Sequence, residues 1–283
     1  MGRNSPLRLL AGLALTLASS LPAPSAERRT AFVEDGAVRI EVLAEGAGPT
    51  IVLLPSSGRD SFDYDAVATG LAAEGFRVLR PQPRGIARST GPMESPTLRD
   101  LAGDVAAVVR REGAGRAVIV GHAFGNWVAR MVAADHPELV RGVVIAAAAA
   151  RTFPRELSAA LATAADPSAP REDRLAALRL AFFAPGNDPA PWLEGWHPAF
   201  YAATRDAGRS VPQAEWWPGG SAPMLDLQAA QDPWRPRATA DDLRAEFGGR
   251  VTVEVVQGAS HALIPERPAE VVRAVAGWAR SLP

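Results

Sequence analysis

The chain has 283 residues, of which 47% are hydrophobic and 22% charged, and its formal net charge is −1. This length and apolar content are enough for a buried core, and the near-neutral charge argues against both a disordered chain and a nucleic-acid-binding protein. The chain has no cysteine, and all 30 basic residues are arginine, which excludes disulfides, cysteine-based metal sites and Schiff-base chemistry on a lysine.

The first 26 residues have the pattern of a secretory signal peptide. Arg3 and Arg8 give a positive start, a mostly apolar run follows from Leu9 to Leu21, and residues 23–26 are small. The apolar run is too short to span a membrane comfortably. We therefore expect a periplasmic or secreted protein without a stable membrane anchor, cleaved near the end of this segment. The alternative is an apolar N-terminal anchor or a buried helix.

Strands and helices then alternate along the chain. Apolar patterns predict strands over 38–43, 50–54, 76–79, 117–120 and 140–146, separated by helices over 62–74, 97–111 and 124–134. After residue 220 they predict strands over 223–229 and 251–256 and helices over 240–247 and 268–280. Continuous apolar runs such as 50–54 are typical of strands covered on both faces. The alternation predicts an α/β fold, a parallel sheet with helices on both faces.

The middle of the chain, residues 151–220, lacks this alternation and reads as helical with proline-rich breaks. Residues 182–217 hold eight of the 18 aromatic residues of the chain. Two interpretations are compatible with each other: a core for a small helical insertion, or a lid whose inner face lines an apolar pocket. We expect a core domain of residues 27–150 and 221–283, a helical lid of 151–220, and a substrate pocket lined by Trp192, Trp196 and Trp216.

A tight turn joins the strand at 117–120 to the following helix. Around it the sequence reads Gly121-His-Ala-Phe-Gly125. Here the chain resembles the α/β-hydrolase family, whose nucleophile sits in a Gly-x-Ser-x-Gly turn between a strand and a helix. The resemblance covers essentially the whole chain after residue 26. It implies a mainly parallel eight-stranded sheet with helices on both faces and a helical lid.

Four further motifs carry the resemblance, and they occur in the family's chain order. Residues 53–58 look like the loop that supplies an oxyanion-hole amide, and residues 80–89 look like a family stretch in which Gln82 replaces an acid. Residues 231–233 resemble the loop of the catalytic acid, and residues 258–268 closely match the histidine loop. The resemblance therefore implies that Asp232 and His261 form an acid–histidine pair.

Position 123 departs from the family pattern, because it is alanine where the family has serine. A methyl group can neither attack a carbonyl nor transfer a proton, so the usual acyl-enzyme cannot form there. The rest of the implied site is complete. The amide of Phe124 begins a helix, and a second oxyanion-hole amide would come from Ser56 or Ser57.

Each of these residues also has a structural interpretation. Asp232 precedes a proline and is a common turn residue, His261 could be a simple loop residue, and His122 fits packing beside the turn better than catalysis. His136 and His197 are isolated, so no metal site is expected, and nothing in the sequence calls for a cofactor.

Three functions remain open. The first is an enzyme in which His261 acts as general base without the serine, or in which Ser56 or Ser57 is a displaced nucleophile. The second is a non-catalytic relative that binds a small apolar ligand. The third is a hydrolase inactivated by a laboratory replacement of serine by alanine. The expected partner is a small molecule, and the aromatic-rich lid and an uncharged site favour a small, mostly apolar ester, lactone or related carbonyl compound.

Overall fold

The computed structural model describes residues 1–2, 28–148, 151 and 154–283. The expected signal peptide therefore lies outside the described residues, except for its first two positions. None of the helices in the described ranges is both long and apolar enough to cross a membrane.

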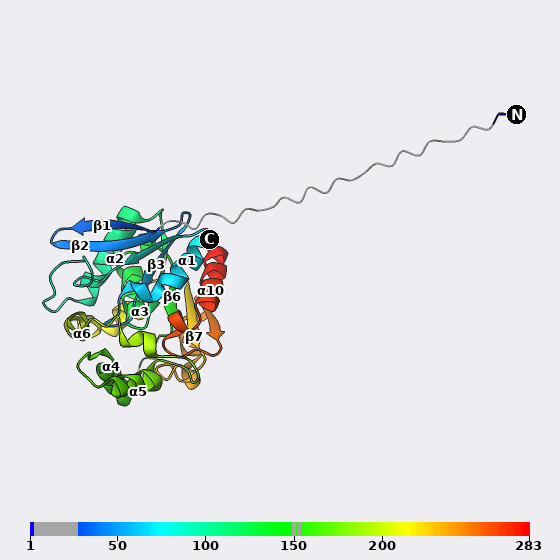
Figure 1. Cartoon of the computed structure of the whole chain (residues 1–283). Helices are drawn as coiled ribbons and strands as arrows, with labels where there is room; N and C mark the ends of the chain where they lie inside the picture. The colour runs from blue at the N-terminus through cyan, green and yellow to red at the C-terminus, as the bar shows by residue number, and fades with distance from the viewer. Residues whose placement is uncertain (3–27, 149–150, 152–153) are drawn as a thin grey trace.

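Within those ranges the chain forms one eight-stranded sheet, ordered β1-β2-β4-β3-β5-β6-β7-β8 (Figure 1). The strands are β1 (Arg29–Asp35), β2 (Val38–Glu45), β3 (Thr50–Leu54), β4 (Arg77–Pro81), β5 (Ala117–His122), β6 (Val140–Ala146), β7 (Met224–Ala229) and β8 (Val251–Val256). Strand β2 pairs antiparallel with β1 and β4, and every other pairing is parallel. The predicted α/β fold, with its mainly parallel eight-stranded sheet, is confirmed.

Helices alternate with the strands after β3 in the described part of the chain. They are α1 (Asp65–Ala73), α2 (Leu98–Glu112), α3 (Phe124–Asp135), α4 (Arg155–Ala165), α5 (Arg171–Ala181), α6 (Pro198–Thr204), α7 (Gln213–Trp216), α8 (Asp242–Phe247), α9 (Leu263–Glu266) and α10 (Pro268–Ser281). Short 3-10 turns are η1 (Ser61–Tyr64), η2 (Pro137–Leu139), η3 (Ala190–Leu193), η4 (Ala207–Arg209), η5 (Arg237–Thr239) and η6 (Gly248–Arg250). The helix expected over 62–74 is thus split into η1 and α1.

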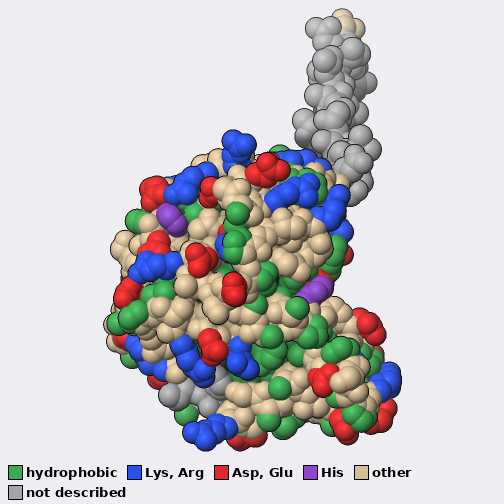
Figure 2. Space-filling view, turned by 90° about the vertical axis from the view of Figure 1, so that its left-hand side faces the viewer, with side chains coloured by type: hydrophobic (Ala, Val, Ile, Leu, Met, Phe, Trp, Pro, Cys, Tyr) green, Lys and Arg blue, Asp and Glu red, His purple; other side chains and the backbone are tan. Residues whose placement is uncertain are grey.

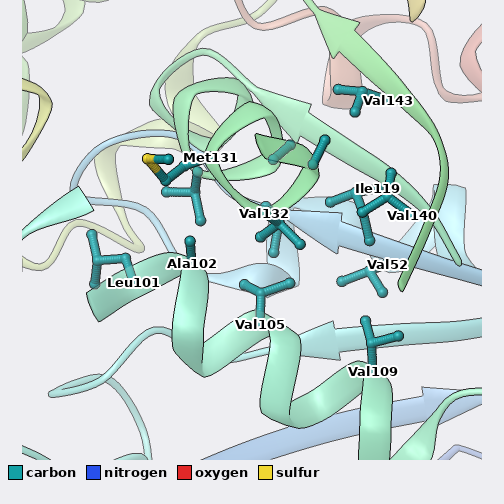
Figure 3. Packing of buried hydrophobic residues seen from close by; sticks show 14 of the residues in the cluster. Val52, Leu101, Ala102, Val105, Val109, Ile119, Met131, Val132, Val140 and Val143 are labelled. Atoms are coloured by element: carbon teal, nitrogen blue, oxygen red, sulfur yellow. The ribbon is translucent and has the colours of Figure 1, made fainter. Parts of the chain in front are cut away.

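The central strands are buried on both faces because their side chains alternate between two apolar clusters. On β3, Val52 and Leu54 belong to the cluster with α2 and α3, whereas Ile51 and Leu53 belong to the cluster with α1 and α10. Figure 3 shows side chains of α2 and α3 packed against those of the sheet. Both layers of helices therefore hold the sheet rigid beneath its loops.

Helices α4 to α7 lie between β6 and β7, and we call them the α4–α7 segment. Figure 1 places α4 and α5 at the end of the molecule opposite β1 and β2. Their own apolar cluster includes Trp234 and Ala262 from the loops after β7 and β8. A polar contact also ties this segment to the loop after β3, because His197 Nε2 lies 2.8 Å from Asp60 Oδ2. The segment therefore contacts the loops after β3, β7 and β8.

Candidate active site

The turn between β5 and α3 is sharp and strained at Ala123, whose φ is 48° and ψ −113°. Side chains other than glycine rarely adopt such a φ, and the surrounding structure must hold it in place. A Cβ atom on Gly121 would lie 2.3 Å from the carbonyl oxygen of Gly125. Only glycine at position 121 lets strand and helix come this close.

The same turn brings α3 against the loop after β3. A Cβ on Gly125 would lie 2.6 Å from the carbonyl oxygens of both Leu54 and Pro55. Ser56 and Ser57 follow directly in that loop, so their amides lie close to the start of α3. The amides of Phe124, Ser56 and Ser57 donate to no residue in the described ranges. Unpaired amides at a helix start favour a negative oxygen.

His261 and Asp232 come together from the loops after β8 and β7. The Nδ1 atom of His261 lies 3.0 Å from Oδ2 and 3.1 Å from Oδ1 of Asp232, and both side chains are buried. Because a carboxylate only accepts, Nδ1 carries the hydrogen and Nε2 is left as the basic nitrogen. Trp234 stacks on the imidazole at 5.2 Å between ring centroids, and its amide donates to Asp232 over 2.8 Å. These contacts fix the orientation of the imidazole.

His122, which the sequence favoured as a packing residue beside the turn, makes a hydrogen bond to the histidine loop. Its Nε2 lies 2.6 Å from the backbone carbonyl oxygen of His261, and since that oxygen only accepts, Nε2–H donates. Burial, reinforced by the nearby His261 side chain, lowers the pKa of His122 to about 3. The neutral imidazole therefore connects the turn at Ala123 with the histidine loop. In the sequence, the one sign of this contact was that His122 directly precedes position 123 in the turn.

One cavity of about 280 Å³ joins these parts. Of the predicted residues, those at its wall are Ser56, Ser57, Ala123, Phe124 and His261. Asp232 lies behind His261 and does not line the cavity. The remaining wall is formed by Trp127, Ser158, Leu161, Phe182, Tyr201, Thr204, Arg205, Arg209 and Trp234.

Trp192, Trp196 and Trp216 are not among the described residues that line this cavity. Trp192 is 2% exposed and packs edge-to-face on Phe183, while Trp216 is buried and stacks on Trp127, which itself lines the cavity. Trp196 donates its indole hydrogen to the carbonyl of Trp192. These large side chains instead hold the α4–α7 segment together and onto the core, where burial of aromatic area stabilises most.

The cavity also differs in charge from the expectation of an uncharged site, because Arg205 and Arg209 line it. Sequence reasoning missed these arginines, which lie in a stretch without strand or helix periodicity. It also missed Trp127, although this residue is one helical turn after Phe124 and so shares its face of α3. In the part of the chain that the structure describes, no three His, Cys, Asp or Glu side chains gather closely enough to hold a metal ion.

Comparisons with known proteins place the chain in a family. The model described as "Alpha/beta hydrolase family" matches residues 51–274. Epoxide hydrolase B of Mycobacterium tuberculosis is 34% identical over 99 residues, which cover 34% of this chain and 28% of that protein. The 2-(acetamidomethylene)succinate hydrolase of Mesorhizobium japonicum is 29% identical over 112 residues, 40% of either chain. The matches thus span less than half of these relatives.

Solved structures agree over nearly the whole chain. The esterase from Exiguobacterium antarcticum superposes with a TM-score of 0.71 at 18% identity, covering 88% of this chain and 99% of that one. The enol-lactonase from Burkholderia xenovorans LB400 gives 0.70 at 21% identity, with 89% and 100% covered. At this identity the likeness shows a shared fold. Together with the family model, it shows that the chain belongs to the alpha/beta hydrolase family.

Proposed function

We propose that this protein hydrolyses a small ester or a related carbonyl compound with His261 as general base, and without a serine nucleophile. The observation that carries the proposal is the wall of one cavity, which His261, Phe124, Ser56 and Ser57 line together. The proteins similar to this chain include an esterase, an enol-lactonase and a 2-(acetamidomethylene)succinate hydrolase by name, which fits a hydrolytic reaction.

The proposed reaction begins with water. His261 Nε2 takes a proton from water as its oxygen attacks the substrate carbonyl carbon, and Asp232 stabilises the imidazolium that forms. The carbonyl oxygen becomes an oxyanion, which the amides of Phe124 and of Ser56 or Ser57 bind by hydrogen bonds. His261 then returns the proton to the leaving alkoxide, so that one ester and one water give one acid and one alcohol.

The side chain of Ala123 is the reason for proposing water, and not a protein side chain, as the nucleophile. In the proposed equivalence, Ala123 stands at the position of the family's serine, and its methyl group offers no oxygen for attack. The acid–histidine pair is nevertheless fully assembled, with Nδ1 of His261 3.0 Å from Asp232. A pure binding protein would have no need of this pair, and this consideration favours the catalytic proposal.

The test is turnover of a panel of p-nitrophenyl esters with short acyl chains. We expect slow hydrolysis that His261→Gln lowers by about 10²- to 10⁴-fold, the usual contribution of a general base. Asp232→Asn should also lower the rate, while Ser56→Ala and Ser57→Ala should keep most of it, because each retains its backbone amide. Thermal unfolding of each variant checks that the fold persists.

Two outcomes would contradict the proposal. Loss of turnover in Ser57→Ala or Ser56→Ala, together with labelling of the unmodified protein by a fluorophosphonate, would identify a displaced serine nucleophile. No turnover of any ester, with His261→Gln indistinguishable from the unmodified protein, would favour a binding protein.

A further inference from the structure

We propose that the cavity takes ligands with an apolar body and one carboxylate, and that Arg205 and Arg209 bind the carboxylate. The inference deepens the proposed function and rests on it for treating this cavity as the substrate site. It departs from the uncharged, mostly apolar compound that the sequence alone indicated.

The charges at the cavity wall are unbalanced. Arg205 and Arg209 line it, and none of the described residues that line it is aspartate or glutamate. Both arginines pair with Asp206, whose carboxylate lies 2.8 Å from the guanidinium of Arg209 and 3.6 Å from that of Arg205. One carboxylate shared by two guanidinium groups leaves one positive charge uncompensated. An anionic ligand would complete this cluster.

The two arginines and the reacting groups come from different parts of the fold. Arg205 follows α6 and Arg209 ends η4, both in the α4–α7 segment. His261, Ser56 and Ser57 belong to the loops of the sheet. A ligand held by the arginines therefore spans from the α4–α7 segment to the sheet, with its reacting carbonyl at the sheet side.

Aromatic side chains line the wall of the same cavity. Trp127, Phe182, Tyr201 and Trp234 all lie at the cavity. They provide apolar and π surface for the body of a ligand and no charge. This combination fits an aryl or alkyl chain that carries a carboxylate better than a fully polar ligand.

The exposure of the two arginines determines how strongly they bind a carboxylate and how much salt weakens that binding. Their side chains are 67% and 84% exposed, so each contributes modestly and salt screens it. We expect binding of the anion to weaken as ionic strength rises from 20 to about 300 mM, whereas binding of a neutral analogue should hardly change.

The experiment compares 4-phenylbutyrate with 4-phenylbutyramide, which differ in charge but scarcely in shape. Calorimetry or tryptophan fluorescence measures their binding at low salt. We expect the acid to bind more tightly, and Arg205→Gln with Arg209→Gln to weaken it by roughly 10-fold while leaving the amide within about 2-fold. Asp206→Asn should strengthen binding of the acid, because it frees both arginines. Asp206 makes no side-chain cap for η4, so this change spares the local fold.

Arg244→Gln is the matched control. Arg244 pairs with Asp241 three residues before it, as Arg209 pairs with Asp206, and it is also exposed but does not line the cavity. It should leave binding of both compounds unchanged. Equal binding of the acid and the amide, or a double arginine variant that binds the acid like the unmodified protein, would overturn the proposal.

Binding and turnover separate this inference from the proposed function. If no ester is hydrolysed but the acid shows the arginine dependence, the hydrolase proposal fails and the ligand class stands. If esters are hydrolysed through His261 while the arginine variants change neither binding nor turnover of charged esters, the ligand class fails and the hydrolase proposal stands.

Discussion

The imidazole of His122 donates a hydrogen bond to the backbone carbonyl of His261 over 2.6 Å. His122 ends β5 directly before the strained turn at Ala123, and His261 lies in the loop after β8. This bond therefore spans two loops that are far apart in the sequence and places the proposed general base relative to the turn. His122 acts as a positioning residue in this arrangement, because it touches the backbone of His261 and not the cavity.

Replacing His122 by leucine should destabilise the protein by about 1–3 kcal/mol, since the buried carbonyl of His261 would lose its partner. His122→Gln keeps an N–H donor at a similar distance and should lose much less. Unfolding in urea measures both. If hydrolysis is detected, the leucine variant should also lower kcat more than the glutamine variant. Equal stability of the two would show that the hydrogen bond contributes little.

The pH dependence of stability should carry the signature of His122. Burial lowers its pKa to about 3 in the folded protein, with the His261 side chain and Arg59 acting in the same direction. The unfolded chain, with a pKa near 6.5, binds more protons between these values, so acid favours unfolding. The stabilisation is complete above about pH 6.5 and declines as the pH falls, by about 2 kcal/mol between pH 7 and pH 5.

His122→Gln isolates this contribution, because glutamine does not titrate. The difference in unfolding free energy between the unmodified protein and the variant should shift by that amount over the same range. Parallel pH profiles for the two proteins would contradict a neutral, buried His122.

Several parts of the fold and site follow from sequence because their causes are local. The apolar run of β3 and the glycines at 121 and 125 reflect burial on two faces and a close approach of backbones. Strand β1 was missed because most of its side chains are exposed and it pairs only at one edge of the sheet. The three predicted pocket tryptophans lie in the stretch between β6 and β7, whereas Trp127 lies on α3 and Trp234 follows β7. Only the packing of the α4–α7 segment on these elements separates wall from core.

Two glycine-to-alanine changes should have opposite effects on stability, because α3 lies close to the loop after β3 and one face of α2 is open. In Gly125→Ala the new methyl would lie 2.6 Å from two backbone carbonyl oxygens, which cannot yield without moving the sheet. We expect a loss of at least about 3 kcal/mol or failure to fold. Gly103→Ala, in the interior of α2, meets nothing within 4 Å and should gain about 0.5–1 kcal/mol from helix propensity. A Gly125→Ala variant as stable as the unmodified protein would refute the close approach.

The last prediction concerns the missing oxygen itself. Ala123→Ser should give labelling by a fluorophosphonate and raise ester hydrolysis by at least about 100-fold, because members of a triad act as a unit and loss of the serine can cost on the order of 10⁶ in rate. Little new strain is expected, since alanine already holds φ at 48° there and serine adds one atom. Adding His261→Gln to this variant should abolish most labelling.

Ala87→Ser is the control for Ala123→Ser, because Ala87 also has a positive φ, of 51°, and is exposed, yet lies outside the cavity wall. Its serine should remain unlabelled, which would attribute reactivity at position 123 to its partners and not to backbone strain. If Ala123→Ser folds but gains neither labelling nor turnover, the amides and imidazole are not arranged for attack from this position. The same groups would then not activate water either. A protein that binds a ligand without catalysis would explain the cavity better.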